Sequence, residues 1–194
     1  MEKIIKNILS DSLEVKESFI RANTTNIMAC AEKIAYAFTS DRKLMLCGNG
    51  GSAADAQHIA GEFINRFLLE RPPLPAIALT TDTSVLTSIG NDYSFEDVFS
   101  KQVKALGVEG DILLAISTSG NSANVISAVK DAKNQGIYTV GLTGGDGGKL
   151  ATLVDMALVV KSNVTPRVQE AQILAGHIIC ELVDYILFQR AAEE

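Results

Sequence analysis

The stretch KLMLCGNGGS, residues 43–52, is a short apolar run that ends in a cluster of glycines. Apolar runs of this length, bounded by turn residues, are typical of buried β-strands. A helical pattern begins at Ser52, so we predict a strand over 43–47 and a tight strand-to-helix turn at the glycines. Strands connected through helices in this way are typical of parallel sheets.

The same alternation of strand and helix continues along the chain. Helical periodicity over 4–38 precedes the glycine turn, and a long helical stretch over 165–190 closes the chain, with Pro166 in its first turn. Between them we predict strands at 76–79, 111–116, 138–142 and 156–160, and helices at 52–69, 94–106 and 122–135. This order predicts an α/β fold in one domain over 1–194, with a mostly parallel five-stranded sheet flanked by helices.

The last helical stretch carries more apolar residues than a single buried stripe requires. They are Val168, Ile173, Leu174, Ile178, Ile179, Leu182, Val183, Ile186 and Leu187. The excess indicates that this helix packs against more than its own sheet, so we expect an oligomer whose core contains the N- and C-terminal helices. A C-terminal helix buried within a monomer is the alternative.

Composition argues against several classes of protein. The net charge of -6 argues against a nucleic-acid binder, which usually has a basic face. The three cysteines lack the paired spacing of a zinc ribbon or a disulfide framework, so we interpret them as reduced core residues. We find neither a signal-peptide pattern nor an uninterrupted apolar run that could span a membrane. We therefore expect a soluble cytoplasmic protein that binds no nucleic acid and no membrane.

The glycine loop is a candidate phosphate site. Its glycines allow a close backbone approach, and the helix from Ser52 presents unpaired N–H groups and a positive dipole end to an anion. Residues 48–53 nearly match the G-x-G-x-x-G/A dinucleotide fingerprint, which expects an acidic residue at the end of a second strand about 20 residues later. Glu70 instead ends a predicted helix, which disfavours a dinucleotide. A tight turn without a ligand is the remaining alternative.

A second loop with related chemistry is Ser117-Thr118-Ser119-Gly120-Asn121-Ser122, directly after the predicted strand at 111–116. Hydroxyls, loop N–H groups and a helix N-terminus can surround a phosphate at the carboxyl end of a strand without any lysine. Two such loops predict one phosphorylated ligand between them. Neither loop ends in Gly-Lys-Ser/Thr, which disfavours Walker-type nucleotide binding, and a serine-rich helix cap is the alternative for this segment alone.

His58 and Glu62 lie four residues apart in the helix that follows the glycine loop. Positions i and i+4 share one helix face, so this imidazole and this carboxylate can converge on one substrate or ion. Taken singly, a histidine in a helix is often a buried core residue without a ligand, and a glutamate is usually exposed to solvent.

Together these motifs resemble the sugar isomerase (SIS) family, and most closely its phosphoheptose isomerase branch. The resemblance covers essentially the whole chain and depends on the order and spacing of residues 47–52, His58 with Glu62, 90–92, 117–124, 142–144, 167–170 and His177. It implies an SIS-type domain that interconverts sedoheptulose 7-phosphate and D-glycero-D-manno-heptose 7-phosphate through an enediol. That reaction would be the first step toward ADP-heptose, a precursor of the lipopolysaccharide core.

The resemblance also implies roles for individual residues. Glu62 and His177 would carry the proton chemistry. Substrate contacts are implied at Asn49, Gly50, Gly51, Ser52, Glu62, Asn91, Asp92, Ser117, Thr118, Ser119, Ser122 and Gln169. A zinc ion in each subunit would be held by His58, Glu62, Gln169 and His177. A homotetramer with sites at its subunit interfaces is implied as well.

The implied zinc ligands raise a question of distance. Eight residues separate Gln169 from His177, which is a rise of about 12 Å along a helix. Either the first turn of this helix bends so that Gln169 reaches inward, or a neighbouring subunit supplies one of the two. The sequence leaves both alternatives open.

A binding protein is the main alternative to the enzyme. The family includes a non-enzymatic DnaA initiator-associating protein, which residues 64–67, 70–72 and 74–79 resemble, and phosphosugar-binding regulatory modules. The initiator-associating branch is expected to lack the constellation of His58, Glu62, Gln169 and His177. Its presence here favours the isomerase.

Overall fold

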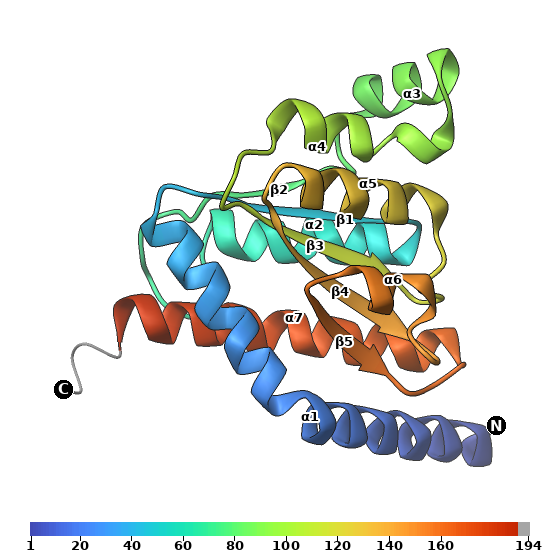
Figure 1. The fold of residues 1–194 in the computed structure, drawn as a ribbon. Helices are drawn as coiled ribbons and strands as arrows, with labels where there is room; N and C mark the ends of the chain where they lie inside the picture. Colours follow the sequence, from blue (N-terminus) through green and yellow to red (C-terminus); the bar gives the residue numbers. More distant parts are fainter. Residues whose placement is uncertain (190–194) are drawn as a thin grey trace.

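Five strands form one parallel sheet in the order β2-β1-β3-β4-β5 (Figure 1) in a computed structural model that describes residues 1–189. The strands are β1 (Leu44–Gly48), β2 (Ala76–Ala78), β3 (Ile112–Ser117), β4 (Tyr138–Gly144) and β5 (Met156–Val160). In the register, Leu44 pairs with Ala76 on one side and with Ile112 on the other. β1 and β3 are buried along their whole length, as expected for strands covered on both faces. The predicted parallel five-stranded sheet is confirmed.

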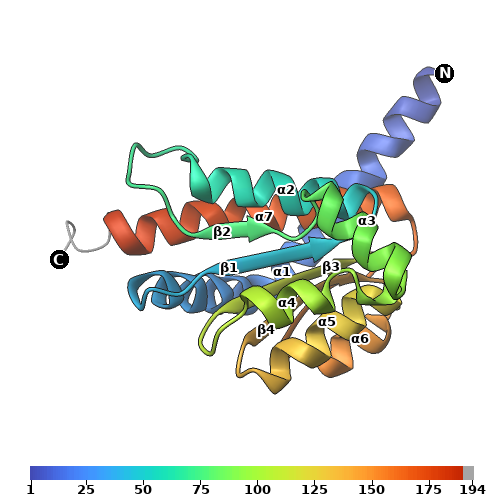
Figure 2. The same cartoon turned by 90° about the horizontal axis from the view of Figure 1, so that it is seen from above.

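Helices cover both faces of the sheet, as Figures 1 and 2 show. The helices are α1 (Glu2–Thr39), α2 (Gly51–Ile64), α3 (Thr83–Asp92), the short 3-10 helix η1 (Phe95–Asp97), α4 (Ser100–Leu106), α5 (Ala123–Asn134), α6 (Gly148–Leu153) and α7 (Thr165–Phe188). One hydrophobic core lies between the sheet and α1, α2 and α7. A second core lies between the opposite face and α4, α5 and α6.

Alternation along the strands separates the two cores. In β1, Leu44 and Leu46 belong to the core under α1, α2 and α7, whereas Met45 and Cys47 belong to the other core. Successive side chains of a strand point to opposite faces, so a strand that is apolar throughout contributes to both cores.

α1 is one continuous helix of 38 residues, whose two halves have different environments. Its second half is buried against the core, with Ile34 only 1% exposed. Its first half bends away and projects beyond the body of the protein (Figures 1 and 2). This projecting half carries exposed apolar side chains: Ile4, Ile5, Ile8, Leu9 and Leu13.

Several predicted boundaries differ from the structure. The helix predicted over 52–69 ends at Ile64, because residues 65–75 form a loop that returns to the sheet. The stretch predicted as one helix over 94–106 divides into η1 and α4. α3 and α6 were not predicted. None of the residues of α3 is fully buried, although Leu86 and Ile89 pack against the core, and Asp82 caps the helix by accepting a hydrogen bond from Val85 N.

α7 is long and apolar enough to pass a length-and-composition test for a membrane span. In this fold it is a core helix, because Ala171, Ala175, Ile179 and Val183 are buried against the same core as α1 and α2. The predicted end of this helix at Arg190 lies outside the described residues.

The three cysteines are free and buried, as predicted for reduced core residues. Burial raises the pKa of Cys30 and of Cys47 to about 12. Burial also raises the pKa of Cys180. These thiols therefore stay protonated and unreactive near neutral pH.

A polar contact anchors the projecting half of α1 to the start of α7. The Ser12 hydroxyl donates to Glu170 Oε2 at 2.6 Å, and Arg167 pairs with the other oxygen of this carboxylate. Arg167 also donates to the carbonyl of Ile8 at 3.2 Å. Burial by itself would raise the pKa of Glu170, but the bonds from Ser12 and Arg167 outweigh it and hold this pKa below its usual value.

We expect Glu170→Gln to make the stability of the protein less dependent on pH. A carboxylate with a depressed pKa contributes stability above the pKa of the unfolded chain, about 4.3 for Glu, and loses it as pH falls through the lower folded pKa. Urea unfolding should therefore show the wild type more stable than Glu170→Gln at pH 7, with a difference that disappears in acid. Glu17→Gln, which removes an exposed ion pair with Arg21, is the control and should change little. A difference that is constant with pH would contradict this account of the anchor.

Candidate active site

The carboxyl ends of β1 and β3 form the topological switch point of the sheet. From β1 the chain adds β2 on one side, and it then crosses to add β3 on the other side. Ligands in open α/β sheets bind outside the carboxyl ends of strands at such a point. Gly48 pairs with Ile116 in the register, so the glycine loop and the loop from Ser117 to Ser122 start side by side. The structure therefore brings the two predicted phosphate loops together.

Asn49 and Asn124 join these two loops through a reciprocal amide pair. Each side chain donates to the other's oxygen, at 2.8 and 2.9 Å. Asn124 is buried, and its oxygen also accepts from Val125 N at 2.9 Å. The side chain of Asn49, which we predicted to contact substrate, thus holds α5 against the glycine loop. The sequence pattern did not indicate this pairing because 75 residues separate the two amides.

The N-terminus of α5 is suited to bind an anion. Ser122 is its N-cap residue, and the Ser117 and Ser122 hydroxyl oxygens are 2.9 Å apart. The first N–H groups of a helix have no partner within it and carry its positive dipole end. Gly120 adopts a φ of 64°, and a side chain there would collide with the Gly147 backbone. The loop therefore requires glycine at this position.

The glycine loop is also closely packed. Gly50 has a φ of 56°, and Ser52 is buried in the first turn of α2. A side chain on Gly48 would come within 2.7 Å of the Ser52 carbonyl oxygen, and one on Gly51 would overlap the amide of Gln169. Gln169, at the start of α7, therefore lies directly against this loop.

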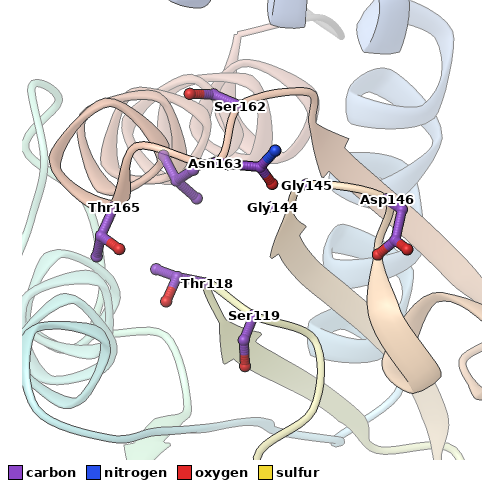
Figure 3. A pocket seen from close by; sticks show the side chains of 9 residues that line it. Thr118, Ser119, Gly144, Gly145, Asp146, Ser162, Asn163 and Thr165 are labelled. Carbon is purple, nitrogen blue, oxygen red and sulfur yellow. The ribbon is translucent and has the colours of Figure 1, made fainter.

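A polar cavity of about 270 Å³ extends from Thr118 and Ser119 along the same edge of the sheet (Figure 3). Its other lining residues follow β4, follow β5 or begin α7: Gly144, Gly145, Asp146, Ser162, Asn163, Thr165 and Val168. Of these lining residues, only Thr118 and Ser119 were predicted to contact substrate. Gly144 and Val168 lie within stretches that carry the family resemblance, 142–144 and 167–170, without a predicted role of their own. The remaining residues belong to no motif.

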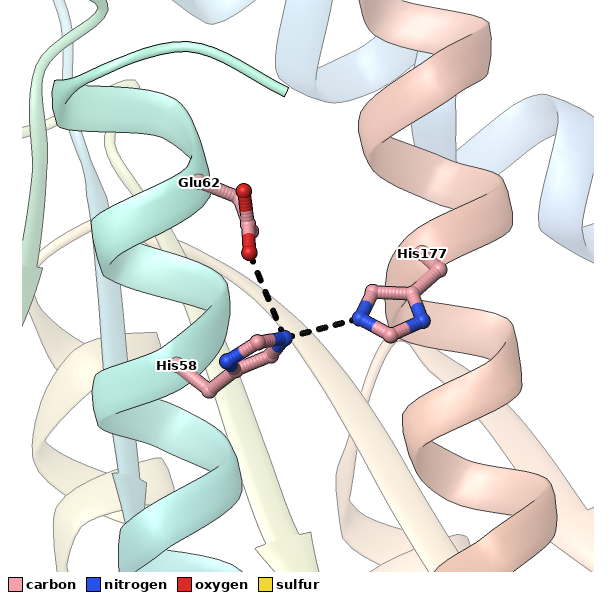
Figure 4. Close-up of side chains that lie close together, drawn as sticks. All are labelled: His58, Glu62 and His177. Carbon is pink, nitrogen blue, oxygen red and sulfur yellow. Dashed lines mark hydrogen bonds and ion pairs between the residues drawn. The ribbon is translucent and has the colours of Figure 1, made fainter. Parts of the chain in front are cut away.

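His58 and Glu62 of α2 converge with His177 of α7 (Figure 4). The Nε2 atoms of the two histidines are 2.8 Å apart, and His58 Nε2 is 3.3 Å from Glu62 Oε1. The His177 ring stacks on Phe67, with centroids 5.5 Å apart and an interplanar angle of 24°. The predicted i, i+4 pair therefore shares its site with a residue 119 positions away from His58.

α2 and α7 run parallel, and this separates Gln169 from the other predicted zinc ligands. Gly51 lies beside Gln169, and further along both helices Ile59 lies beside Gly176. His58 and His177 thus meet at one level, about two turns after the level of Gln169. Within the chain, three of the four predicted ligands converge, and Gln169 lies with the glycine loop. A contribution from a neighbouring subunit stays a prediction.

Asn91 and Asp92 lie exposed at the carboxyl end of α3, where Asn91 Nδ2 donates to Asp92 Oδ1 at 2.9 Å. α3 packs through Leu86 and Ile89 against the core on the opposite face from α2 and α7. Their predicted contacts with substrate therefore stay predictions.

Asp55 is a candidate site residue that our sequence analysis missed. It precedes His58 by three residues and Glu62 by seven, so all three lie on one face of α2. Burial raises the pKa of Asp55, partly offset by the charge of His58. One of its carboxylate oxygens is buried without a hydrogen-bond partner among residues 1–189. The i, i+3, i+7 spacing could have revealed it.

His58, Glu62 and His177 fit a divalent metal ion. They present two imidazole nitrogens and one carboxylate oxygen, all within 4.8 Å of one another. Two histidines and a glutamate are a ligand set that zinc uses in catalytic sites, where a fourth position stays open for water or substrate. The donor set is therefore chemically suited to the zinc that the sequence resemblance implied.

Known proteins resemble this chain in sequence and in overall structure. The family model described as the SIS domain matches residues 9–144. The phosphoheptose isomerase of Nitratidesulfovibrio vulgaris (strain Miyazaki F) is 52% identical over 187 residues, which cover 96% of this chain and 90% of that protein. The Clostridium acetobutylicum phosphoheptose isomerase is 50% identical over 196 residues, with full coverage of both. The structure of phosphoheptose isomerase GmhA from Neisseria gonorrhoeae superposes with a TM-score of 0.89 at 45% identity, covering 94% of this chain and 98% of that one.

Zinc affinity measured by competition with a chelator will test the three-residue cluster. We expect His58→Ala to weaken binding by more than ~100-fold, because it removes one of the converging donors. We expect Gln169→Ala to change the affinity by less than about threefold, because Gln169 lies at the glycine loop. A large loss with Gln169→Ala would instead show that a neighbouring subunit brings this amide to the metal.

Proposed function

The chain belongs to the SIS domain family, among relatives named phosphoheptose isomerases, and on that premise we propose that it interconverts sedoheptulose 7-phosphate and D-glycero-D-manno-heptose 7-phosphate. The observation that carries the proposal is the convergence of His58, Glu62 and His177. A base and two imidazoles lie on helices that begin at the edge of the sheet where the two anion loops meet. Isomerisation of a phosphorylated sugar uses these two parts, a site for the phosphate and groups that transfer protons.

We assign the phosphate to the two loops at the switch point. Gly50, Gly51 and Ser52 supply backbone N–H groups at the start of α2, and the N-terminus of α5 faces the same region. The hydroxyl groups come from the second loop, at Ser117, Thr118, Ser119 and Ser122. Neutral donors of this kind bind a phosphate without lysine, which is consistent with a chain of net charge -6.

The proposed reaction moves two protons and leaves the atomic composition of the sugar unchanged. Glu62 takes a proton from C1 of the ketose, the C–H electrons form the C1–C2 double bond, and the C2 carbonyl oxygen receives a proton from His177. In the second half, His177 takes the proton of the C1 hydroxyl, whose electrons form the aldehyde. Glu62 then returns its proton to C2. Both residues end in their starting protonation states.

The geometry of the cluster suits this division of roles. Glu62 Oε1 faces His58, and the carboxylate is partly exposed, so its other oxygen is available to substrate. Stacking on Phe67 fixes the plane of the His177 ring. We propose a zinc site in each subunit, formed by His58, Glu62 and His177, and when bound the ion supplies Lewis-acid polarisation of the sugar carbonyl.

A binding protein without catalysis is the alternative, in the form of the DnaA initiator-associating branch or a phosphosugar-binding module. Its support is the resemblance of residues 64–67, 70–72 and 74–79 to the initiator-associating branch. The convergence of three residues able to transfer protons or bind metal favours the enzyme, because phosphate binding alone has no need of them.

We place the enzyme in the cytoplasm as a single SIS domain over 1–194, at the first step toward ADP-heptose.

An isomerase assay with sedoheptulose 7-phosphate tests the catalytic roles. We expect Glu62→Gln and His177→Ala each to lower kcat by ~10²- to 10⁴-fold, the usual contribution of a general acid or base. Glu181→Gln is the matched control, because Glu181 is exposed on α7 one turn beyond His177. Activity that survives in Glu62→Gln would overturn its role as the base. A folded wild type that is inactive with and without zinc would favour the binding protein.

We also propose a homotetramer with active sites at subunit interfaces. The projecting half of α1 exposes a row of apolar side chains, with Ile5 67% and Leu9 58% exposed. Burial of such a row stabilises association by about 25 cal/mol per Å² of apolar surface removed from water. A second copy of the chain offers the same helix as a partner.

Light scattering coupled to size exclusion will test this assembly. We expect Leu9→Glu to reduce the mass below that of a tetramer, because it buries a charge in the proposed interface. Asn7→Glu introduces the same charge on the opposite side of the helix, and it should leave the mass unchanged. An unchanged mass in Leu9→Glu, or a monomeric wild type, would contradict the proposed role of α1.

A further inference from the structure

Arg71 and Asp184 form a buried ion pair between the loop after α2 and the helix α7. Arg71 Nε lies 2.8 Å from Asp184 Oδ1, and the two side chains are 1% and 6% exposed. Removing two charges from water costs free energy. The attraction within a buried pair offsets this cost only when its geometry is good and further hydrogen bonds are made. The partners of Arg71 therefore indicate what the pair does.

Arg71 caps the carboxyl end of α2. Its guanidinium donates to the carbonyls of Glu62 at 2.9 Å, Phe63 at 2.7 Å and Asn65 at 3.2 Å. The last carbonyls of a helix have no partner within it and form its negative dipole end. α2 has no basic residue in its own last turn, so Arg71 supplies the cation from outside the helix.

This pair lies directly beside the candidate catalytic residues. Arg71 binds the backbone carbonyl of Glu62 itself. Asp184 follows His177 by seven residues, which is about two turns, so both lie on one face of α7. Arg71 thus links Glu62 of α2 to the face of α7 that carries His177.

A second contact between α2 and α7 lies on the other side of the cluster. Gly176 packs against Ile59, and a side chain on Gly176 would come within 2.6 Å of Ile59 Cδ1. The two helices are therefore held at two levels, with Glu62 and His177 between them. The Gly176 contact limits how closely the helices approach.

We propose that Arg71 and Asp184 are positioning residues that set the register of α2 against α7, so that Glu62 and His177 act on one substrate. The kinetic consequence rests on the proposed function, whereas the effect on the distance between the His58 and His177 rings does not. A planar guanidinium can bind one carboxylate and several carbonyls at once, which the single ammonium of lysine cannot do in the same geometry.

The pair is not built for stability alone. Asp184 Oδ2 is buried and has no hydrogen-bond partner among residues 1–189, so the bidentate geometry of a strong Arg–carboxylate pair is absent. Apolar side chains of similar volume often replace such a pair without loss of stability. Apolar residues at these positions would avoid burying two charges, but they would leave the carbonyls at the end of α2 without the donors that Arg71 supplies.

The test compares Asp184→Ala, Asp184→Asn and the double variant Arg71→Met/Asp184→Leu in the isomerase assay and in urea unfolding. We expect Asp184→Ala to lower kcat by ~10- to 100-fold with KM changed by less than about threefold. Asp184→Asn keeps the acceptor oxygen and should retain kcat within about threefold of the wild type. The double variant leaves no unpaired buried charge, so it should be more stable than Asp184→Ala, and it should not recover kcat.

Lys43→Met is the matched control. Lys43 Nζ lies 2.6 Å from the fully buried Asp111, in a pair that joins the amino ends of β1 and β3. We expect this variant to lose stability while kcat stays within about twofold, because the pair lies at the opposite edge of the sheet from the site. If kcat follows stability in all of these variants, Arg71 and Asp184 have a structural role only and the proposal is overturned.

A second measurement does not depend on any enzymatic activity. The chain contains only two histidines, His58 and His177, so selective ¹³C labelling of histidine reports on the cluster alone. Their ring centroids are 5.0 Å apart, so we expect a nuclear Overhauser effect between the rings in metal-free wild type. It should weaken or vanish in the folded double variant and persist in Lys43→Met. Persistence in the double variant would overturn the positioning role even if the wild type proves inactive on the sugar.

Discussion

The close contact between α2 and α7 is the constraint on which the candidate site depends. Gly176 has no side chain, so Ile59 can pack directly against the backbone of α7. The neighbours of these two residues, His177 and His58, lie at the same level of the two helices, with their Nε2 atoms 2.8 Å apart. Because the two helices run parallel from the same edge of the sheet, the same contact places Gln169 beside Gly51. A small residue where the two helices touch therefore sets how closely they approach each other.

The phosphate loops depend on a different constraint, the order of the strands. β1 and β3 are neighbours, so the loops that follow them emerge side by side at the switch point. The buried amide pair between Asn49 and Asn124 then fixes α5 relative to the glycine loop. The proposed phosphate site thus depends on the sheet, and the proposed proton-transfer site depends on helix packing. The loop after β3 can therefore vary without disturbing the convergence of α2 and α7.

The charge distribution is consistent with a small anionic substrate. The chain is acidic, yet the proposed phosphate site uses backbone N–H groups, hydroxyls and helix N-termini. The carboxylate of Glu62 lies beside two imidazoles at the other end of α2 from the glycine loop. The negative groups of enzyme and substrate are therefore kept apart, which lets one ligand carry a phosphate and react beside a carboxylate.

The strands, the two loops and the His58–Glu62 pair could be predicted from the sequence, because each depends on spacing within a short segment. Hydrophobic periodicity did not predict α3, none of whose residues is fully buried. It also placed the end of α2 too far along the chain, where Arg71 caps the helix from outside. The resemblance to a family indicated His177 as a candidate. Its contact with His58 and the separation of Gln169 from both histidines became visible only in the tertiary structure. The same is true of the pairing of Arg71 with Asp184. These contacts join residues more than 100 positions apart, and the register of two packed helices decides them, which no local pattern encodes.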